Sequence, residues 1–258
     1  MDKKIEKFLD SLNISRGDIL YVASDITRLL LYSKKNKVVF DLNKLIDYFL
    51  EKIGTEGTLL FPTFNWEFCQ GKTFDIKNSK SETGSLSKYA LNRSDFRRSK
   101  HPIYSFAIKG RDQKYLCELD DQSGWGPKSL FAYFHENSAK NLFIGIDYKN
   151  GFTFDHYFEE KIGVDYRYFK YFEGDYIDYD GVKRKKKYKM YVRDLNKNIV
   201  TSINQKLDDV LLKKKGYERY FFNDVYFGLV NMKIAGDVME NDIIESGGLI
   251  FAKKINEL

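Results

Sequence analysis

Cysteine is scarce in this sequence of 258 residues, which contains only Cys69 and Cys117. Neither thiol belongs to a CxxC pair or has a histidine nearby, so the sequence offers no disulfide framework and no structural zinc site. Long apolar runs are also missing, and none approaches the roughly 20 residues that a membrane-spanning helix needs. Residues 1–9 form an amphipathic start without the apolar core of a signal peptide. We therefore expect a cytoplasmic protein that has no membrane span and binds no metal.

The excess of positive charge is small. The chain has 43 basic and 37 acidic residues, which give a net charge of +6, and much of the excess lies in one run at 183–189. A dedicated nucleic-acid-binding domain would show a stronger bias, so we expect no nucleic-acid partner. The hydrophobic content of 43% is enough for a sizeable core in one large domain or in two coupled lobes.

Strand and helix patterns alternate in the first part of the chain, which indicates an α/β fold with a central sheet. Apolar runs predict strands at 18–23, 58–61, 104–108 and 142–146. Amphipathic or capped segments predict helices at 2–13, 26–31, 42–52, 86–92, 111–119 and 129–137. Ser24-Asp25 is expected to cap the second of these helices, and Asp41 the third.

The pattern changes after Tyr166. Asp180-Gly181 between two strand-like segments, 176–179 and 182–195, is typical of a β-hairpin. A helix is expected at 204–215, and short strands at 222–251 with turns at Asn223-Asp224 and Gly247-Gly248. We therefore expect a single unit over 1–258 whose C-terminal portion, from about residue 166, is rich in β-structure.

The chain has three histidines, and each suggests a different role. His135 ends an amphipathic helix and is expected to be solvated there, where a cation is favoured. His101 precedes Pro102 in a loop and suits either a binding or a structural role.

His156 follows the apolar strand at 142–146 and has Glu159 three residues further on. If Thr153 caps a helix here, His156 and Glu159 lie on one face of it. Glu159 could then accept a proton from one imidazole nitrogen and leave the other free as a base. A surface pair of no function is the alternative.

Several motifs occur in the order found in one enzyme family. They are Gly17-Asp18-Ile19-Leu20, Ser24-Asp25-Ile26, 57–64, Gly84-Ser85-Leu86, 98–105 and Thr153-x-x-His156-x-x-Glu159. Together they resemble the aminoglycoside 3-N-acetyltransferase family across about residues 15–170. The resemblance implies an α/β/α layered fold and transfer of an acyl group from acetyl-CoA or another acyl-CoA to an amine.

The resemblance also implies roles for individual residues. His156 would be the general base and Glu159 its orienting partner. Ser24, Asp25, Ile26, Thr27, Thr63, Ser105 and Thr153 would surround the coenzyme A arm. The oxyanion of the reaction needs hydrogen-bond donors, for which we expect the Thr63 hydroxyl or the backbone N–H groups of the 24–26 turn. Helix-start N–H groups at 26–28 suit the pyrophosphate.

Basic residues recur near the matched motifs and suggest a phosphate-bearing acceptor, because arginine pairs well with phosphate. The expected substrate-binding residues are Arg98, Lys100, Arg167 and Arg193. We therefore expect a nucleotide diphosphate-linked amino sugar, as used in surface polysaccharide biosynthesis. The alternatives are aminoglycoside 3-N-acetylation, which confers antibiotic resistance, and a binding protein for anionic polymers or membrane surfaces. The lysines at 183–189 suit a solvated hairpin edge equally well.

Overall fold

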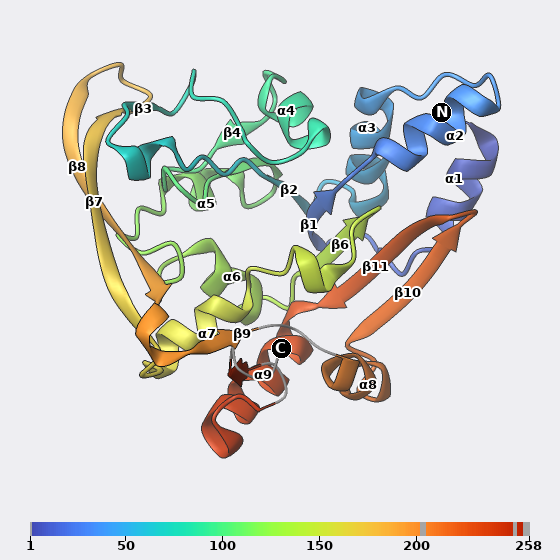
Figure 1. The fold of residues 1–258 in the computed structure, drawn as a ribbon. Coiled ribbons are helices and arrows are strands. Elements are labelled where there is room, and N and C mark those ends of the chain that lie inside the picture. Colours follow the sequence, from blue (N-terminus) through green and yellow to red (C-terminus); the bar gives the residue numbers. More distant parts are fainter. Residues whose placement is uncertain (1, 202–204, 250–251, 255–258) are drawn as a thin grey trace.

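The computed structural model describes residues 2–201, 205–249 and 252–254 and has a seven-stranded mixed sheet at its centre (Figure 1). In spatial order the strands are β10 (Tyr217–Phe222), β11 (Val225–Asn231), β6 (Lys140–Ile144), β1 (Ile19–Ser24), β2 (Thr58–Pro62), β5 (Phe106–Gly110) and β4 (Arg97–Arg98). β1 runs parallel to both of its neighbours, β2 and β6, whereas the outer pairs are antiparallel. The carboxyl ends of β1, β2 and β6 therefore meet at one edge of the sheet.

The sheet is buried on both faces, because alternate side chains of each strand point to opposite sides. On β1, Leu20 and Val22 belong to one hydrophobic cluster, and Tyr21 and Ala23 belong to the other. The first cluster includes side chains of α1 (Lys3–Asp10), α2 (Thr27–Lys35), α3 (Leu42–Ile53) and α4 (Ser85–Leu91). The second includes side chains of α5 (Gln113–Glu118), α6 (Leu130–Glu136), α7 (Asp155–Ile162), α8 (Gln205–Lys213) and α9 (Met232–Ser246). The predicted α/β/α arrangement is confirmed.

A long curved hairpin stands apart from this sheet, at the left of Figure 1. Its strands β7 (Arg167–Ile177) and β8 (Lys183–Arg193) pair antiparallel along their full length, and β3 (Phe74–Asp75) adds to the edge of β7. The predicted turn is present, with Gly181 in the left-handed region at φ 75°. The first strand is far longer than the four residues expected. Shorter elements are η1 (Glu67–Gln70), η2 (Tyr148–Asn150), η3 (Leu195–Lys197), β9 (Ile199–Thr201) and β12 (Ala252–Lys254).

The end of the chain differs from the prediction of short strands at 222–251. The turn at Asn223-Asp224 does join β10 to β11, but a 15-residue helix, α9, follows. Its buried residues follow helical spacing along one face, but they include Gly236 and Asp242, while Ile244 is exposed, so the sequence shows no clear apolar stripe. Residues 204, 250 and 251 of the predicted elements lie outside the described residues. Among the described residues, no helix combines the length and apolar character needed to span a bilayer.

Candidate active site

The helix α7 carries His156 and follows β6 and η2. Its N-cap is Phe154, without a side-chain hydrogen bond, so the predicted Thr153 cap is wrong. The Thr153 hydroxyl is instead buried beside Tyr21, and the structure does not present it to a coenzyme A arm. Gly163 ends the helix in the left-handed conformation, φ 76°. His156 therefore lies in the first turn of a short helix that starts just beyond the sheet edge.

His156 and Glu159 lie together as predicted. Nδ1 of His156 is 2.7 Å from Oε2 of Glu159, whose side chain is fully buried. The His156 side chain keeps 24% of its surface exposed. An ionised carboxylate only accepts hydrogen bonds, so the Nδ1 proton points at Glu159. That tautomer leaves the Nε2 lone pair free to take a proton.

Glu159 has two further polar neighbours. The Tyr166 hydroxyl donates to Oε1 at 3.1 Å, and the Arg167 Nε lies 2.7 Å from Oε2. Burial by itself raises the pKa of Glu159, but the hydrogen bond from His156 and the charge of Arg167 outweigh it and lower that pKa. The carboxylate is therefore ionised despite its burial.

Arg167 belongs to this cluster and not to an open phosphate site. Its side chain is only 7% exposed, and its NH1 group donates to the Tyr191 carbonyl at 3.0 Å. Its NH2 group also lies 3.1 Å from His156 Nδ1. Because Nδ1 already carries the proton that faces Glu159, this last contact brings two donors together and is not a hydrogen bond. The expected diphosphate contact of Arg167 is not supported by this geometry.

A second carboxylate completes the cluster. Asp155 is buried, and its Oδ1 lies 3.4 Å from His156 Nδ1. Burial raises the pKa of Asp155 to about 6, with His156 acting in the opposite direction. Asp155, His156 and Glu159 could each offer one ligand atom to a cation. The Arg167 guanidinium, however, already supplies positive charge at this point.

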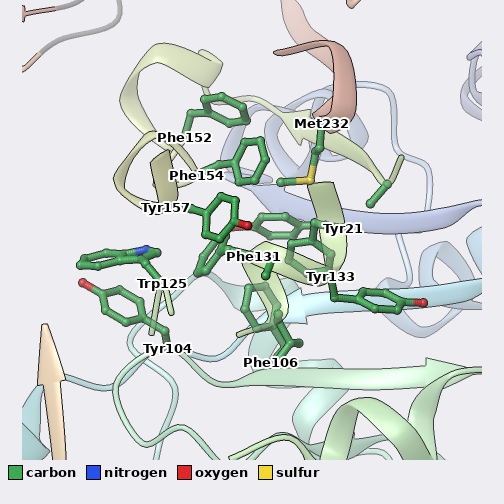
Figure 2. Packing of buried hydrophobic residues seen from close by; sticks show 14 of the residues in the cluster. Tyr21, Tyr104, Phe106, Trp125, Phe131, Tyr133, Phe152, Phe154, Tyr157 and Met232 are labelled. Atoms are coloured by element: carbon green, nitrogen blue, oxygen red, sulfur yellow. The ribbon is translucent and has the colours of Figure 1, made fainter. Parts of the chain in front are cut away.

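Aromatic rings form the wall next to His156. The Trp125 ring meets the imidazole edge to face, with centroids 4.8 Å apart, and packs on Tyr104 at 4.6 Å. Figure 2 shows Trp125 and Tyr104 together at one side of the buried aromatic cluster. The large apolar ring of Trp125 beside the base excludes water from that side of the imidazole.

Thr63 and Ser105 lie in the core and not in an open cleft. Both are fully buried, and their hydroxyls are 3.0 Å apart. Arg98, 2% exposed, donates from Nε to the Ser105 hydroxyl at 2.9 Å and from NH2 to the Thr63 carbonyl at 2.6 Å. Its NH1 group donates to the Ser79 carbonyl. All three guanidinium nitrogens bond within the protein and the side chain is buried, so the structure does not present Arg98 to a substrate phosphate.

The two other predicted phosphate ligands are separated. Lys100 pairs with Glu118 at 2.6 Å and is mostly covered. Arg193 lies at the end of β8 and lines a cavity of about 920 Å³.

The turn at Ser24–Thr27 is built differently from the prediction. Ile26 is the N-cap of α2, and Asp25 accepts from the Thr27 backbone N–H at 3.0 Å. The Thr27 hydroxyl and backbone N–H both lower the pKa of Asp25, so it is a carboxylate. The Thr27 N–H is therefore already bonded, to a negative group that would repel a pyrophosphate. Ser24 ends β1 beside this turn.

Two cations lie further along α2. A cavity of about 400 Å³ is lined by Arg28, Tyr32 and Lys35 together with the turn at Asn223-Asp224. Arg28 donates to the main-chain carbonyl of Asp224 at 3.0 Å and stays largely exposed. An anionic group would therefore be held better by Arg28 and Lys35 along α2 than by the first backbone N–H groups of that helix.

The 920 Å³ cavity was not expected from the sequence. It lies between the base of the hairpin and η1, and its lining includes Trp66, Cys69, Tyr168, Lys170, Phe172, Met190, Val192 and Arg193. Its volume is within the range of small-molecule sites. The one sequence signal for it is alternation: 168, 170 and 172 on β7 face the same way as 190 and 192 on β8.

Tyr104 lies within electrostatic range of residues of this cavity and of the His156 cluster. Burial raises the pKa of Tyr104, and Cys69 and Trp66 on the cavity side also act on it, as do Arg167 and Asp155 on the other side. The lining of the cavity does not include His156 itself.

The basic row of the hairpin pairs largely with neighbouring acids. Lys183 and Lys185 lie 3.6 and 2.9 Å from Asp175, and Lys186 lies 2.8 Å from Asp120. These contacts favour the interpretation of the row as a solvated hairpin edge.

The other two histidines have structural environments. His101 is buried, and its Nδ1 accepts from the Tyr104 backbone N–H at 3.0 Å. Burial lowers the pKa of His101 to about 3. His135 was expected to be solvated, which is wrong: it is 7% exposed and lies 2.9 Å from Asp237 of α9. The missed helix α9 explains this error, because it covers the end of α6.

Comparisons with known proteins give a consistent result. The profile of the aminoglycoside 3-N-acetyltransferase family matches residues 32–232. The structure is similar to the aminoglycoside acetyltransferase AAC(3)-Xa, with a TM-score of 0.77 at 18% identity over 94% of this chain and 92% of that chain. AAC-IIIb, solved as a binary complex with CoASH, gives 0.74 at 15% identity over 92% and 93%. The YokD protein from Bacillus subtilis gives 0.74 at 17% identity over 95% and 98%.

At these identities the solved structures show the fold, and the family follows from the profile. Comparison with curated protein sequences gives no significant match. The profile covers well over half of the chain. The chain therefore belongs to the aminoglycoside 3-N-acetyltransferase family, a family of acyltransferases.

Proposed function

We propose that the chain acts as one unit that transfers an acetyl group from acetyl-CoA to the amine of an amino sugar, with His156 as the general base. The observation that carries this proposal is the 2.7 Å contact between His156 Nδ1 and the buried Glu159 carboxylate. It fixes the imidazole tautomer and leaves Nε2 as the proton acceptor. The aromatic wall of Trp125 supports the role, because it shields the base from water.

The reaction needs such a base. An alkyl amine is mostly protonated near neutral pH and attacks a thioester only after it loses a proton. In the proposed reaction the amine nitrogen bonds to the acyl carbon, its proton passes to Nε2, and the carbon–sulfur bond breaks to release the thiolate. A positioned base typically contributes about 10²–10⁴ in rate. Acetyl-CoA supplies the activated acyl group, and the thiolate needs little acid assistance to leave.

Coenzyme A would lie near the edge of the sheet where β1, β2 and β6 end. The exposed cations Arg28 and Lys35 on α2 would hold its phosphates, since both line the cavity there. The similar protein AAC-IIIb was solved with CoASH, which supports a coenzyme A co-substrate for this chain. The buried hydroxyls of Thr63 and Ser105 would act by shaping the strand ends and not by direct contact.

The acceptor class that is best supported is an aminoglycoside. Neighbouring structures include AAC(3)-IVa in complex with a gentamicin and AAC-VIa with sisomicin. A diphosphate acceptor is less well supported, because Arg98, Lys100 and Arg167 make contacts within the protein.

A nucleotide-linked amino sugar, as in surface polysaccharide biosynthesis, is the second candidate, and one observation favours it. The 920 Å³ cavity combines the exposed rings of Trp66 and Tyr168 with the cations Lys170 and Arg193. Rings suit stacking on a planar base, and cations suit phosphate. Both cations would repel a polycationic antibiotic.

The two acceptors can be separated by measuring thiol release from acetyl-CoA. The panel would contain sisomicin, gentamicin, a free amino sugar and a uridine diphosphate-linked amino sugar. If the acceptor is an aminoglycoside, kcat/KM is highest for an antibiotic, and Lys170→Met leaves its KM unchanged or lowers it. If the acceptor is nucleotide-linked, Lys170→Met raises KM by about 10-fold or more. Lys187→Met, on the opposite face of the hairpin, is the matched control.

A further inference from the structure

We infer that Arg167 is a positioning residue that sets the charge and the orientation of the His156–Glu159 pair. The inference rests on the proposed function, because it assigns a task within that site. It replaces the expectation that Arg167 binds substrate. The residue acts through Glu159 and His156 and does not contact the reacting atoms.

Two elements meet at Arg167. The residue begins β7, soon after the end of α7, so the strand and the helix approach each other there. The hydrogen bond from NH1 to the Tyr191 carbonyl holds the guanidinium from the β8 side. Nε then lies 2.7 Å from the same Glu159 oxygen that faces His156. The carboxylate is thus fixed by two groups that approach it from different elements.

The four side chains of the cluster also balance one another in charge. Asp155 and Glu159 are two buried carboxylates beside one imidazole, and Arg167 is the cation that lies among them. With a neutral imidazole and both carboxylates ionised, the four side chains sum to a charge of −1. When His156 takes the amine proton, the sum becomes zero. Proton transfer therefore neutralises a buried charge, which favours it.

Without Arg167 the same cluster would carry −2 before proton transfer. The additional negative charge would favour the protonated imidazole, so a larger share of His156 would already carry a proton in the resting enzyme and could not accept one from the amine. The titratable groups that face Arg167 come from several elements. They are Asp155, His156 and Glu159 of α7, Tyr166 before β7, Tyr191 of β8 and Tyr104 before β5.

The test compares Arg167→Met and Arg167→Lys with wild type through the pH dependence of kcat/KM. Removal of a cation within about 4–6 Å of an ionisable group raises the pKa of that group by roughly 1–3. For Arg167→Met we expect the acid limb to move to higher pH by about one unit or more, with kcat near neutrality reduced at least about 10-fold. Arg167→Lys keeps the positive charge, so the acid limb of its kcat/KM profile should stay near that of wild type. Its kcat should still fall, because lysine cannot hold Glu159 in the same orientation. Arg184→Met removes an exposed hairpin arginine that pairs with Asp180, and it should change neither quantity.

A readout that does not need turnover makes the inference independent of the proposed function. Protein labelled with ¹⁵N-histidine has three ring systems, and His156→Asn identifies the one that matters. We expect wild-type His156 to carry its proton on Nδ1, and its titration midpoint to rise in Arg167→Met. Unchanged midpoints and an unchanged acid limb in the folded variants would overturn the inference, as would a change confined to the acceptor KM. Lack of turnover in wild type with the expected tautomer would overturn the proposed function alone.

Discussion

Oε2 of Glu159 accepts a hydrogen bond from Nδ1 of His156 over 2.7 Å while the carboxylate is completely buried. A buried carboxylate is costly unless it is paired and hydrogen-bonded. Here Tyr166 and Arg167 supply the remaining contacts. The relationship explains how a partly exposed imidazole is held in one tautomer at the edge of the sheet.

Replacement of His156 by Asn should remove the base and keep a polar side chain of moderate size. We expect kcat to fall by roughly 10²–10⁴, because a positioned base typically contributes that much. Binding of coenzyme A, measured by calorimetry, should be nearly unchanged. Wild-type turnover in the folded variant would show that another group takes the proton.

Glu159→Gln should cause a smaller loss. The amide oxygen can still accept the Nδ1 proton, but the negative charge that favours the imidazolium is gone. We expect kcat to fall by about 10-fold and less than in His156→Asn. The comparison requires both variants to have melting temperatures close to wild type. A loss equal to that of His156→Asn would mean that the charge, and not the orientation, provides most of the effect.

Arg98→Met tests whether this arginine is structural. The variant leaves the carbonyls of Thr63 and Ser79 without their buried donor. We expect the free energy of unfolding to fall by roughly 2–4 kcal/mol, measured by urea denaturation. The neighbouring Arg97→Met removes a half-exposed residue and should cost about 1 kcal/mol or less. An increase in acceptor KM for Arg98→Met without loss of stability would restore the substrate-binding interpretation.

His101 gives a prediction for the pH dependence of stability. Its pKa is lowered to about 3 in the folded protein, against an ordinary value of 6.5. As the pH falls below 6.5 the unfolded chain takes up a proton that the folded protein does not bind until about pH 3. The unfolding free energy should therefore decrease across this window, by up to about 1.4 kcal/mol per pH unit from this group.

His101→Asn should flatten that dependence, since an amide oxygen can accept the Tyr104 N–H without titrating. Urea midpoints measured between pH 4 and 7 would show the difference in slope. Parallel curves for the variant and wild type would assign the acid sensitivity to other groups.

Arg28→Met tests the proposed place of coenzyme A. Arg28 is exposed on α2 beside the 400 Å³ cavity. Loss of one phosphate contact should raise the Kd for coenzyme A by about 10-fold and reduce its salt dependence. Arg16→Met, on a different cavity, is the control. Equal affinities would place the phosphates elsewhere.

The site residues that could be predicted from the sequence are those whose relationship is local. His156 and Glu159 are three positions apart on one helix, so helical geometry alone brings them together. The strands β1, β2 and β6 were also predictable, because each is a short apolar run between turn signals.

What could not be predicted depends on contacts between distant segments. The environments of Arg98 and Arg167 are set by their contacts with the Thr63 carbonyl and with Glu159. Nothing in their immediate sequence distinguishes them from Arg193, which is half-buried and lines a cavity. The helix α9 was missed because its buried face contains Asp242 and Gly236, and Gly236 packs directly against His135 and Phe158. Its absence from the prediction also led to the wrong environment for His135.

The most direct test of the account is release of free thiol from acetyl-CoA in the presence of the acceptor panel, with mass spectrometry of the product. We expect wild type to acetylate one amine for each thiol released, and His156→Asn to reduce this rate by roughly 10²–10⁴. Thiol release that is the same in wild type and His156→Asn, or none with any amine although acetyl-CoA binds, would contradict it.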